Sequence, residues 1–133
     1  MNLIKLSSDL IRFKSVTPNS AGSLEFIEKI LKKNNFNCHL LEFGNKKIKN
    51  LYAEIKGGEG PNLCFAGHTD VVPAGNLKDW TTNPFKPTIK NGFLYGRGAS
   101  DMKTAIAAFM HASLEFLSSC KNKFNGSLSF LLT

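Results

Sequence analysis

An apolar run of four residues, from Leu63 to Ala66, constrains the fold of this chain more than any other feature. Glycines and a proline precede the run, and Gly67, His68 and Asp70 follow it. A short, uninterrupted apolar run predicts a strand covered on both faces, as in parallel sheets. Such a sheet needs helices as its covering layers, so the run indicates an α/β fold.

Apolar residues recur at helical spacing in three other segments. The first begins at Leu3 and ends before Pro18, because a proline disfavours helical geometry in the residue before it. The second follows directly, and either Ser20 or Ser23 can provide its N-cap. The third covers residues 102–117, where a broad apolar face predicts a well-buried helix. We expect these helices to flank the sheet.

Four segments show the signals of further strands. Residues 36–40 and 51–55 alternate between apolar and polar side chains, which predicts two strands with one face each on the core. Asn91 and Gly92 predict a tight hairpin, and residues 128–132 predict a last strand. The resulting fold class is a central, partly parallel, mixed sheet with flanking helices. We expect a single domain over residues 1–133.

The composition excludes some classes of protein. A hydrophobic fraction of 42% with 20% charged residues is ordinary for a globular protein. No apolar run approaches the roughly 18 residues that a membrane span needs. The first fifteen residues mix Lys5, Asp9, Arg12 and Lys14 with apolar positions, which is a helix pattern and not a signal peptide. We therefore expect a cytoplasmic protein without a membrane partner.

The net charge of +7 does not indicate a nucleic-acid partner. The densest basic cluster is Lys46, Lys47 and Lys49, beside a glycine and an asparagine. A nucleic-acid groove would interleave basic residues with stacking aromatic side chains, and this cluster contains none. We interpret it as a solvated loop.

The cysteines indicate neither disulfides nor a thiolate metal site. Cys38, Cys64 and Cys120 are odd in number, widely spaced and without a CxxC pair. We predict reduced and mostly buried thiols.

The pair His68 and Asp70 has the residue types of a metal site. Imidazole nitrogen and carboxylate oxygen are zinc ligands, and a ligating histidine often donates its second N–H to a carboxylate. If the strand continues through Gly67, both side chains project to the same face, so Asp70 can orient His68. Without other motifs, a strand-end histidine beside a turn aspartate is the commoner explanation of such a pair.

Asp101 also has two interpretations. An acidic residue directly before an apolar helix is a good N-cap. Capping does not explain Gly96 and Gly98, which stand on either side of Arg97 and permit unusual backbone angles or close approach. These glycines indicate that the carboxylate is aimed at a site.

Three motifs then carry a resemblance to a known family. They are GHTDVVPAGN (67–76), WTTNPFKPTI (80–89) and LYGRGASDMK (94–103). Together and in this order they resemble the metallo-amidohydrolases of the M20 peptidase family. The resemblance implies the N-terminal part of the catalytic domain of a zinc-dependent exopeptidase-like fold. It is most specific between Gly67 and Lys103.

The resemblance implies roles for three residues. His68 would ligate one metal ion, Asp101 would bridge two, and Asp70 would act as the catalytic residue that orients His68. Zinc is the expected metal, with cobalt or manganese as alternatives. The bond between Asp101 and Met102 is a candidate cis peptide.

The implied activity is hydrolysis of an amide bond in a small N-acyl diamino acid, by a longer protein that forms a homodimer. A glutamate pair, further ligands and an inserted dimerisation domain would lie beyond Thr133. We therefore expect residues 1–133 alone to bind metal weakly and not to turn over. A different N-acyl substrate and a non-catalytic binding module remain alternatives.

Five other residues receive plainer interpretations. His39 and His111 are interpreted as structural histidines and not as ligands. Trp80 and Phe85 either wall a cleft or anchor their proline-rich loop. Arg97 either meets a substrate carboxylate or supports the glycine-rich turn, and we favour support.

Overall fold

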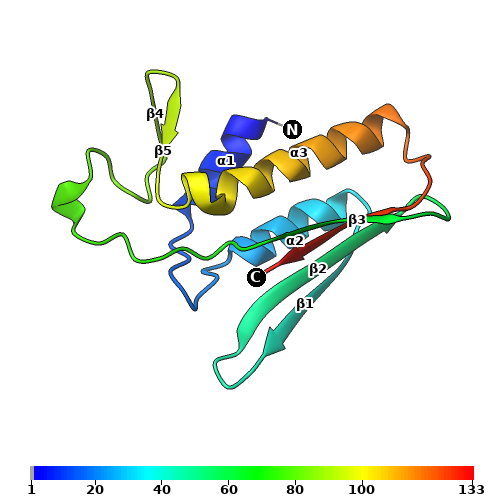
Figure 1. Cartoon of the computed structure of the whole chain (residues 1–133), viewed down its shortest axis with the longest axis horizontal. Coiled ribbons are helices and arrows are strands. Elements are labelled where there is room, and N and C mark those ends of the chain that lie inside the picture. The colour runs from blue at the N-terminus through cyan, green and yellow to red at the C-terminus, as the bar shows by residue number, and fades with distance from the viewer. Residues whose placement is uncertain (1) are drawn as a thin grey trace.

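The sheet orders its strands β1-β2-β6-β3 in the computed structural model, which describes residues 2–133 (Figure 1). The helices are α1 (Leu3–Arg12), α2 (Ser23–Lys33) and α3 (Thr104–Ser119). The four strands of the sheet are β1 (Asn37–Phe43), β2 (Ile48–Lys56), β3 (Asn62–Gly67) and β6 (Ser127–Leu132). A separate hairpin consists of β4 (Thr88–Lys90) and β5 (Phe93–Tyr95). Two short turns are η1 (Leu77–Asp79) and η2 (Ala99–Lys103).

The sheet is mixed, as the sequence predicts. β1 pairs with β2 and β2 pairs with β6 in antiparallel fashion, whereas β3 and β6 are parallel. The chain between β3 and β6 contains the long loop, the hairpin and α3. β6 therefore returns between β2 and β3, and the last residues of the chain lie in the middle of the sheet (Figure 1).

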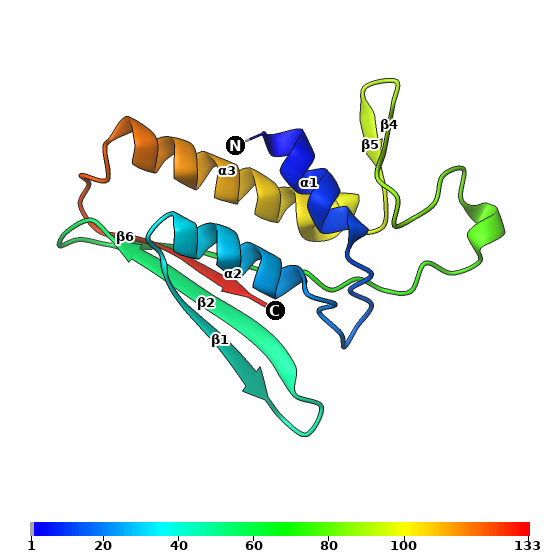
Figure 2. The ribbon, with the colours of Figure 1, turned by 180° about the vertical axis from the view of Figure 1, so that it is seen from behind.

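The core lies between one face of the sheet and the helices (Figure 2). Leu51 of β2 and Phe130 of β6 are fully buried on this face, with Ile27 of α2 and Met110 of α3 in the same cluster. No helix within residues 2–133 covers the opposite face, where Leu131 of β6 is 46% exposed. The helices thus flank the sheet on one side.

Phe130 is the centre of an aromatic cluster in this core. Its ring centroid lies 5.6 Å from that of Phe36 and 5.1 Å from that of Phe109. Phe109 in turn stacks on Phe65 of β3 at 4.8 Å. Offset and edge-to-face aromatic pairs of this kind each add about 0.5–1.5 kcal/mol beyond their buried area. The cluster ties β3 and β6 to α3.

The prediction that residues 63–66 form a strand covered on both faces was wrong. β3 has the expected position, but it is an edge strand and Leu63 is 59% exposed. Its only partner in the described sheet is β6, and no layer from residues 2–133 lies over its outer side. The run is apolar enough for a strand that is buried on both faces, but residues 2–133 do not cover its second face.

One local prediction also needs correction. Neither Ser20 nor Ser23 caps α2, because the N-cap is Gly22 in a left-handed conformation with φ of 88°. A left-handed N-cap favours glycine, which has no Cβ to clash. Ser23 instead donates its hydroxyl hydrogen to the Ser20 carbonyl oxygen at 2.7 Å.

The cysteines are free, as predicted, but they are not buried. Cys64 is exposed on the edge strand β3, and Cys38 and Cys120 are only partly covered. The third helix is likewise less buried than predicted, since Phe116 is 44% exposed. None of the helices in the described range is long and apolar enough to cross a membrane.

Candidate metal centre

A cavity of about 380 Å³ opens where β3 ends and α3 begins. Its wall includes His68 and Asp70 after β3, Asp101 in η2, Trp80 in the long loop, and Thr17 from the N-terminal segment. The three residues that the sequence singles out for a metal site therefore meet in one cavity. They lie beyond the C-terminal end of β3, where open α/β sheets place their ligands.

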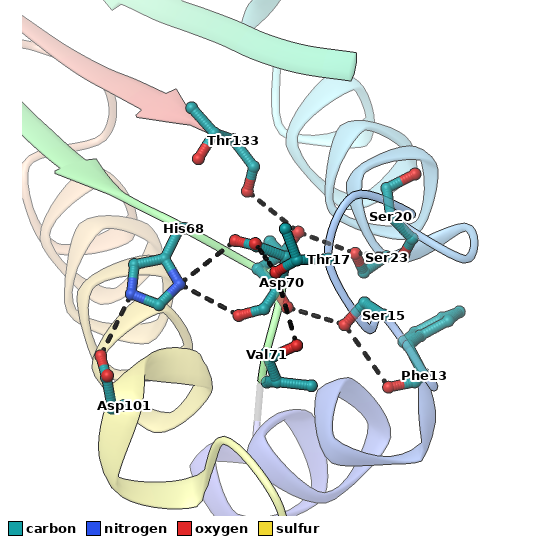
Figure 3. Close-up of polar contacts among 11 residues, drawn as sticks. Phe13, Ser15, Thr17, Ser20, Ser23, His68, Asp70, Val71, Asp101 and Thr133 are labelled. Atoms are coloured by element: carbon teal, nitrogen blue, oxygen red, sulfur yellow. Dashed lines mark hydrogen bonds and ion pairs between the residues drawn. The ribbon is translucent and has the colours of Figure 1, made fainter. Parts of the chain in front are cut away.

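The side chains of His68 and Asp101, which both belong to the wall of this cavity, point toward one another (Figure 3). The Nε2 atom of His68 lies 3.1 Å from Oδ1 of Asp101, and the Asp101 side chain is 84% exposed. Both atoms can serve as ligands to zinc or a similar divalent ion. The fold thus presents an imidazole nitrogen and a carboxylate oxygen side by side.

Asp70 lies on the other side of the imidazole ring. The Nδ1 atom of His68 is 3.0 Å from the Asp70 carbonyl oxygen and 3.4 Å from its Oδ1 atom. β3 ends at Gly67, and residues 68–70, which have no regular secondary structure, bring the two side chains together. Asp70 contacts His68 as predicted, but its backbone carbonyl provides the shorter contact.

Both ring nitrogens of His68 face acceptor oxygens, Nδ1 those of Asp70 and Nε2 that of Asp101. With Nδ1–H donating to Asp70, the neutral ring carries its lone pair on Nε2. The lone pair then faces a carboxylate oxygen, which is also an acceptor, so the two need a proton or a metal ion between them. The donor set therefore fits a divalent metal ion.

The pKa of His68 is raised by the same neighbours. Partial burial disfavours the charged imidazole, but the hydrogen bond to the Asp70 carbonyl and the Asp101 carboxylate outweigh this effect. A proton and a metal ion would accordingly compete for Nε2.

Asp101 does not cap α3, so that alternative is excluded. The N-cap position belongs to Lys103, and Asp101 has the extended backbone angles φ −133° and ψ 98°. The predicted cis peptide between Asp101 and Met102 is confirmed. Gly98 precedes this turn with φ of 80°, and a Cβ atom there would lie 2.6 Å from Val71 Cγ1.

Lys103 is a buried residue at the end of η2, and the sequence patterns did not predict its burial. Its side chain is inaccessible to solvent, and Nζ donates a hydrogen bond to the Phe13 carbonyl oxygen at 2.8 Å. Burial lowers the pKa of Lys103 to about 8, with the charge of Asp70 acting in the opposite direction. The only sequence signal is a lysine within an otherwise apolar helix start.

Arg97 supports the long loop. Its Nη2 donates to the carbonyl oxygens of Pro73 and Ala74 at 3.3 and 3.4 Å, and its guanidinium lies 5.0 Å from the Trp80 ring centroid. Trp80 donates its Nε1–H to Ala74 at 2.9 Å and also lines the cavity. Trp80 thus both lines the cavity and anchors its loop, whereas Phe85 is not part of the cavity wall.

The ligand set within the described chain is small. Among residues 2–133, no group of three or more His, Cys, Asp or Glu side chains is placed to hold a metal ion. His39 lies in β1 and His111 in α3, and neither lines the cavity. Among the described residues, His68 and Asp101 are the candidate ligand pair whose Nε2 and Oδ1 atoms lie together in this cavity.

The chain resembles known proteins along nearly its whole length. The sequence profile described as "Peptidase family M20/M25/M40" matches residues 64–133. The succinyl-diaminopimelate desuccinylase of Wolbachia pipientis subsp. Culex pipiens (strain wPip) is 55% identical over 130 residues. This match covers 98% of the chain and 32% of the relative, so the chain spans about a third of that protein's length.

Solved structures have the same fold. The M20 family metallo-carboxypeptidase Sso-CP2 from Sulfolobus solfataricus is 25% identical with a TM-score of 0.86, covering 99% of this chain and 30% of that protein. YXEP of Bacillus subtilis, a dinuclear metal-binding peptidase of the M20 family, is 18% identical with a TM-score of 0.63. It is matched over 98% of this chain and 33% of its own.

The profile match contains every residue of the cavity wall except Thr17. His68 and Asp70 follow β3, Arg97 lies before η2, and Asp101 lies within it. The match covers more than half of the 133 residues. This chain belongs to peptidase family M20/M25/M40.

Proposed function

We propose that residues 1–133 are the N-terminal, metal-binding part of the catalytic domain of an amidohydrolase. Its reaction would cleave N-succinyl-LL-2,6-diaminopimelate to succinate and LL-2,6-diaminopimelate. The observation that carries the proposal is the pairing of His68 Nε2 with Asp101 Oδ1 at 3.1 Å in an open cavity. The 55% identity to a desuccinylase supports this substrate.

The three residues of the site have distinct roles in this proposal. His68 and Asp101 would hold divalent metal ions, and Asp70 would keep the Nε2 lone pair of His68 directed at them. Bound metal would polarise the amide carbonyl and lower the pKa of a water molecule. Zinc is the proposed metal, because it accepts both imidazole and carboxylate ligands, and cobalt or manganese are alternatives.

The proton transfer to the departing amine needs a further acid or base. Asp70 and Asp101 are the two carboxylates from residues 2–133 that line the cavity, and both already have other roles. The 133-residue chain would therefore bind metal without completing the reaction. The missing group and the remaining ligands would come from residues beyond Thr133.

The test is hydrolysis by the complete reading frame and by the 133-residue chain. With zinc added, the complete protein should release succinate from the succinylated substrate, and the 133-residue chain should not. Turnover by the 133-residue chain would contradict the division of roles. No turnover of the succinylated substrate by the complete, folded, metal-loaded protein would contradict the proposed reaction.

A related activity is the second candidate. The likeness to a metallo-carboxypeptidase at a TM-score of 0.86 favours a deacylase or peptidase that acts on another N-acyl amino acid, such as acetylornithine. The substrate-binding residues that distinguish these activities would lie outside residues 1–133. Comparing kcat/KM of the complete protein on succinylated diaminopimelate and acetylornithine decides between them.

A non-catalytic binding module is the candidate of another class. The observation that favours it is the set of only two ligands within the described residues. A glutamate pair encoded shortly after Thr133 would support the enzyme, whereas a stop codon there would support the module. The enzyme proposal includes three further points about the complete protein. It would form a homodimer, it would be located in the cytoplasm, and its substrate would be a small molecule.

A further inference from the structure

Thr17 lies beside the candidate metal centre, although 53 residues separate it from Asp70. Its hydroxyl donates a hydrogen bond to Oδ2 of Asp70 and lies 3.5 Å from the Val71 carbonyl oxygen (Figure 3). The other carboxylate oxygen of Asp70, Oδ1, is the one that lies 3.4 Å from His68 Nδ1. The Asp70 carboxylate thus stands between the threonine hydroxyl and the imidazole.

The backbone holds Thr17 in this place. Thr17 N–H donates to the Val71 carbonyl at 3.1 Å, and Val71 N–H donates to the Ser15 carbonyl at 2.8 Å. These bonds form an isolated parallel bridge between Val16 and Val71. The N-terminal segment 15–17 therefore runs alongside the segment 68–71 that carries His68 and Asp70, independently of the threonine hydroxyl.

The carboxylate of Asp70 needs such a fixed partner. The terminal torsion of an aspartate is soft, so its two oxygens can rotate out of position at little energetic cost. The Asp70 side chain is also 31% exposed, so water can compete for its oxygens. Because the backbone fixes Thr17, its hydroxyl can hold Oδ2 of Asp70 in place. This contact directs Oδ1 of Asp70 toward the ring of His68.

We propose that Thr17 is a positioning residue of the metal centre, because its hydroxyl holds the Asp70 carboxylate, which acts together with the Asp70 carbonyl oxygen on the orientation and tautomer of His68. Partners beyond the ligands themselves commonly influence metal affinity by 10- to 100-fold. The proposal rests on the metal site proposed above, but its effect on the imidazole exists before any metal binds. A purely structural role for Thr17 is the competing explanation.

Three variants separate the two explanations. Thr17→Val keeps the shape and the backbone bonds but removes the hydroxyl, and Thr17→Ser keeps the hydroxyl. Thr88→Val is the matched control, because Thr88 donates its hydroxyl hydrogen to the Lys86 carbonyl at 3.0 Å in the hairpin strand β4. Thr17 is exposed, so valine there leaves no buried polar group without a partner.

The first measurement uses the metal-free 133-residue chain. Long-range proton–nitrogen NMR at a pH where the imidazole is neutral reports the tautomer of His68. We expect the Nδ1–H tautomer to predominate in the wild type, in Thr17→Ser and in Thr88→Val, and to fall to a smaller fraction in Thr17→Val, where the Asp70 carbonyl oxygen remains a partner of Nδ1. Melting temperatures of all four proteins show whether each variant is folded.

The second measurement is the zinc affinity of the same four proteins, by competition with a chromophoric chelator. Thr17→Val should bind zinc about tenfold more weakly, and the other two variants should bind it within about twofold of the wild type. Unchanged His68 signals and zinc affinity in a folded Thr17→Val would overturn the role of Thr17. Equal losses in Thr17→Ser and Thr17→Val would also overturn it, because the hydroxyl would then not be responsible.

The two proposals fail in different ways. A wild-type chain that binds no zinc contradicts the metal site, while the tautomer of His68 still decides the role of Thr17. A wild type that binds zinc and is matched by Thr17→Val in both measurements contradicts the role of Thr17 alone.

Discussion

The imidazole Nε2 of His68 lies 3.1 Å from Oδ1 of Asp101, although the two residues are 33 positions apart. One follows the edge strand β3 and the other lies in the turn before α3. Because Nδ1 of the same ring contacts Asp70 at 3.0 Å, Nε2 is left to face the carboxylate. This relationship leads to the first prediction.

Asp101→Asn should weaken zinc binding by the 133-residue chain at least about tenfold, because a neutral amide is a poor ligand for a divalent cation. The amide can still hydrogen-bond to His68, so the fold should be kept. Asp79→Asn, in η1 and outside the cavity wall, is the matched control. Calorimetric titration with zinc measures both. Equal affinities of the two variants would exclude Asp101 as a ligand.

Gly98→Ala should destabilise the chain more than Gly75→Ala. Both glycines have positive φ, 80° and 77°, so alanine costs about 1–2 kcal/mol of backbone strain at either position. At Gly98 the new Cβ would also lie 2.6 Å from Val71, whereas nothing lies within 4 Å at Gly75. The clash should add about 1–3 kcal/mol. Urea unfolding measures the difference, and equal losses would contradict the close packing at Gly98.

Phe130→Ala should lower the free energy of unfolding by about 3–5 kcal/mol, because it leaves a cavity at the centre of the aromatic cluster. Phe130 is fully buried, and its neighbour Leu131 is 46% exposed on the opposite face. Leu131→Ala is therefore the control and should cost less than about 1 kcal/mol. Chemical unfolding followed by circular dichroism compares them. Similar losses would mean that another layer covers the outer face in solution.

The ion pair between Glu25 of α2 and Lys49 of β2 should make stability depend on acid pH. Burial raises the pKa of Glu25, but the hydrogen bond and charge of Lys49 outweigh this and lower it below 4.5. A lowered pKa means that the carboxylate stabilises the fold above about pH 4.5 and loses this effect as the pH falls through the folded-state value.

Glu25→Gln should therefore be less stable than the wild type at pH 7, and the difference should shrink toward pH 3. Both side chains are about a third exposed, so added salt should reduce the difference as well. Glu59→Gln is the control, since Glu59 is exposed and forms no ion pair within residues 2–133. Melting curves across this pH range provide the test. A pH-independent difference would show that the charge of Glu25 does not matter.

The local elements were largely predictable. Alternation identified β1 and β2, helical spacing identified α1 and α2, and Asn91 with Gly92 identified the hairpin of β4 and β5. These patterns succeed because the side-chain period of an element is set by its own backbone geometry. Caps are harder, and the N-cap at Gly22 was missed because its left-handed conformation uses no side chain.

The surroundings of the site were less predictable. The motifs around His68 and Asp101 indicate these two residues as candidate metal ligands. No sequence pattern predicts the hydrogen bond from Thr17 to Asp70 or the one from Lys103 to the Phe13 carbonyl oxygen. Each of these contacts joins segments more than fifty residues apart. Their partners are chosen by packing and not by the local sequence.

The sequence by itself determined the types of element, the mixed α/β class, the residues of the candidate metal pair and the resemblance to the M20 family. Only the tertiary structure decided that β6 lies between β2 and β3, that β3 is an exposed edge and that Nε2 of His68 faces Asp101. Periodicity records which side of an element is apolar, because that depends on local geometry. Which surface covers that side, and which carboxylate meets which ring nitrogen, depends on contacts between distant segments.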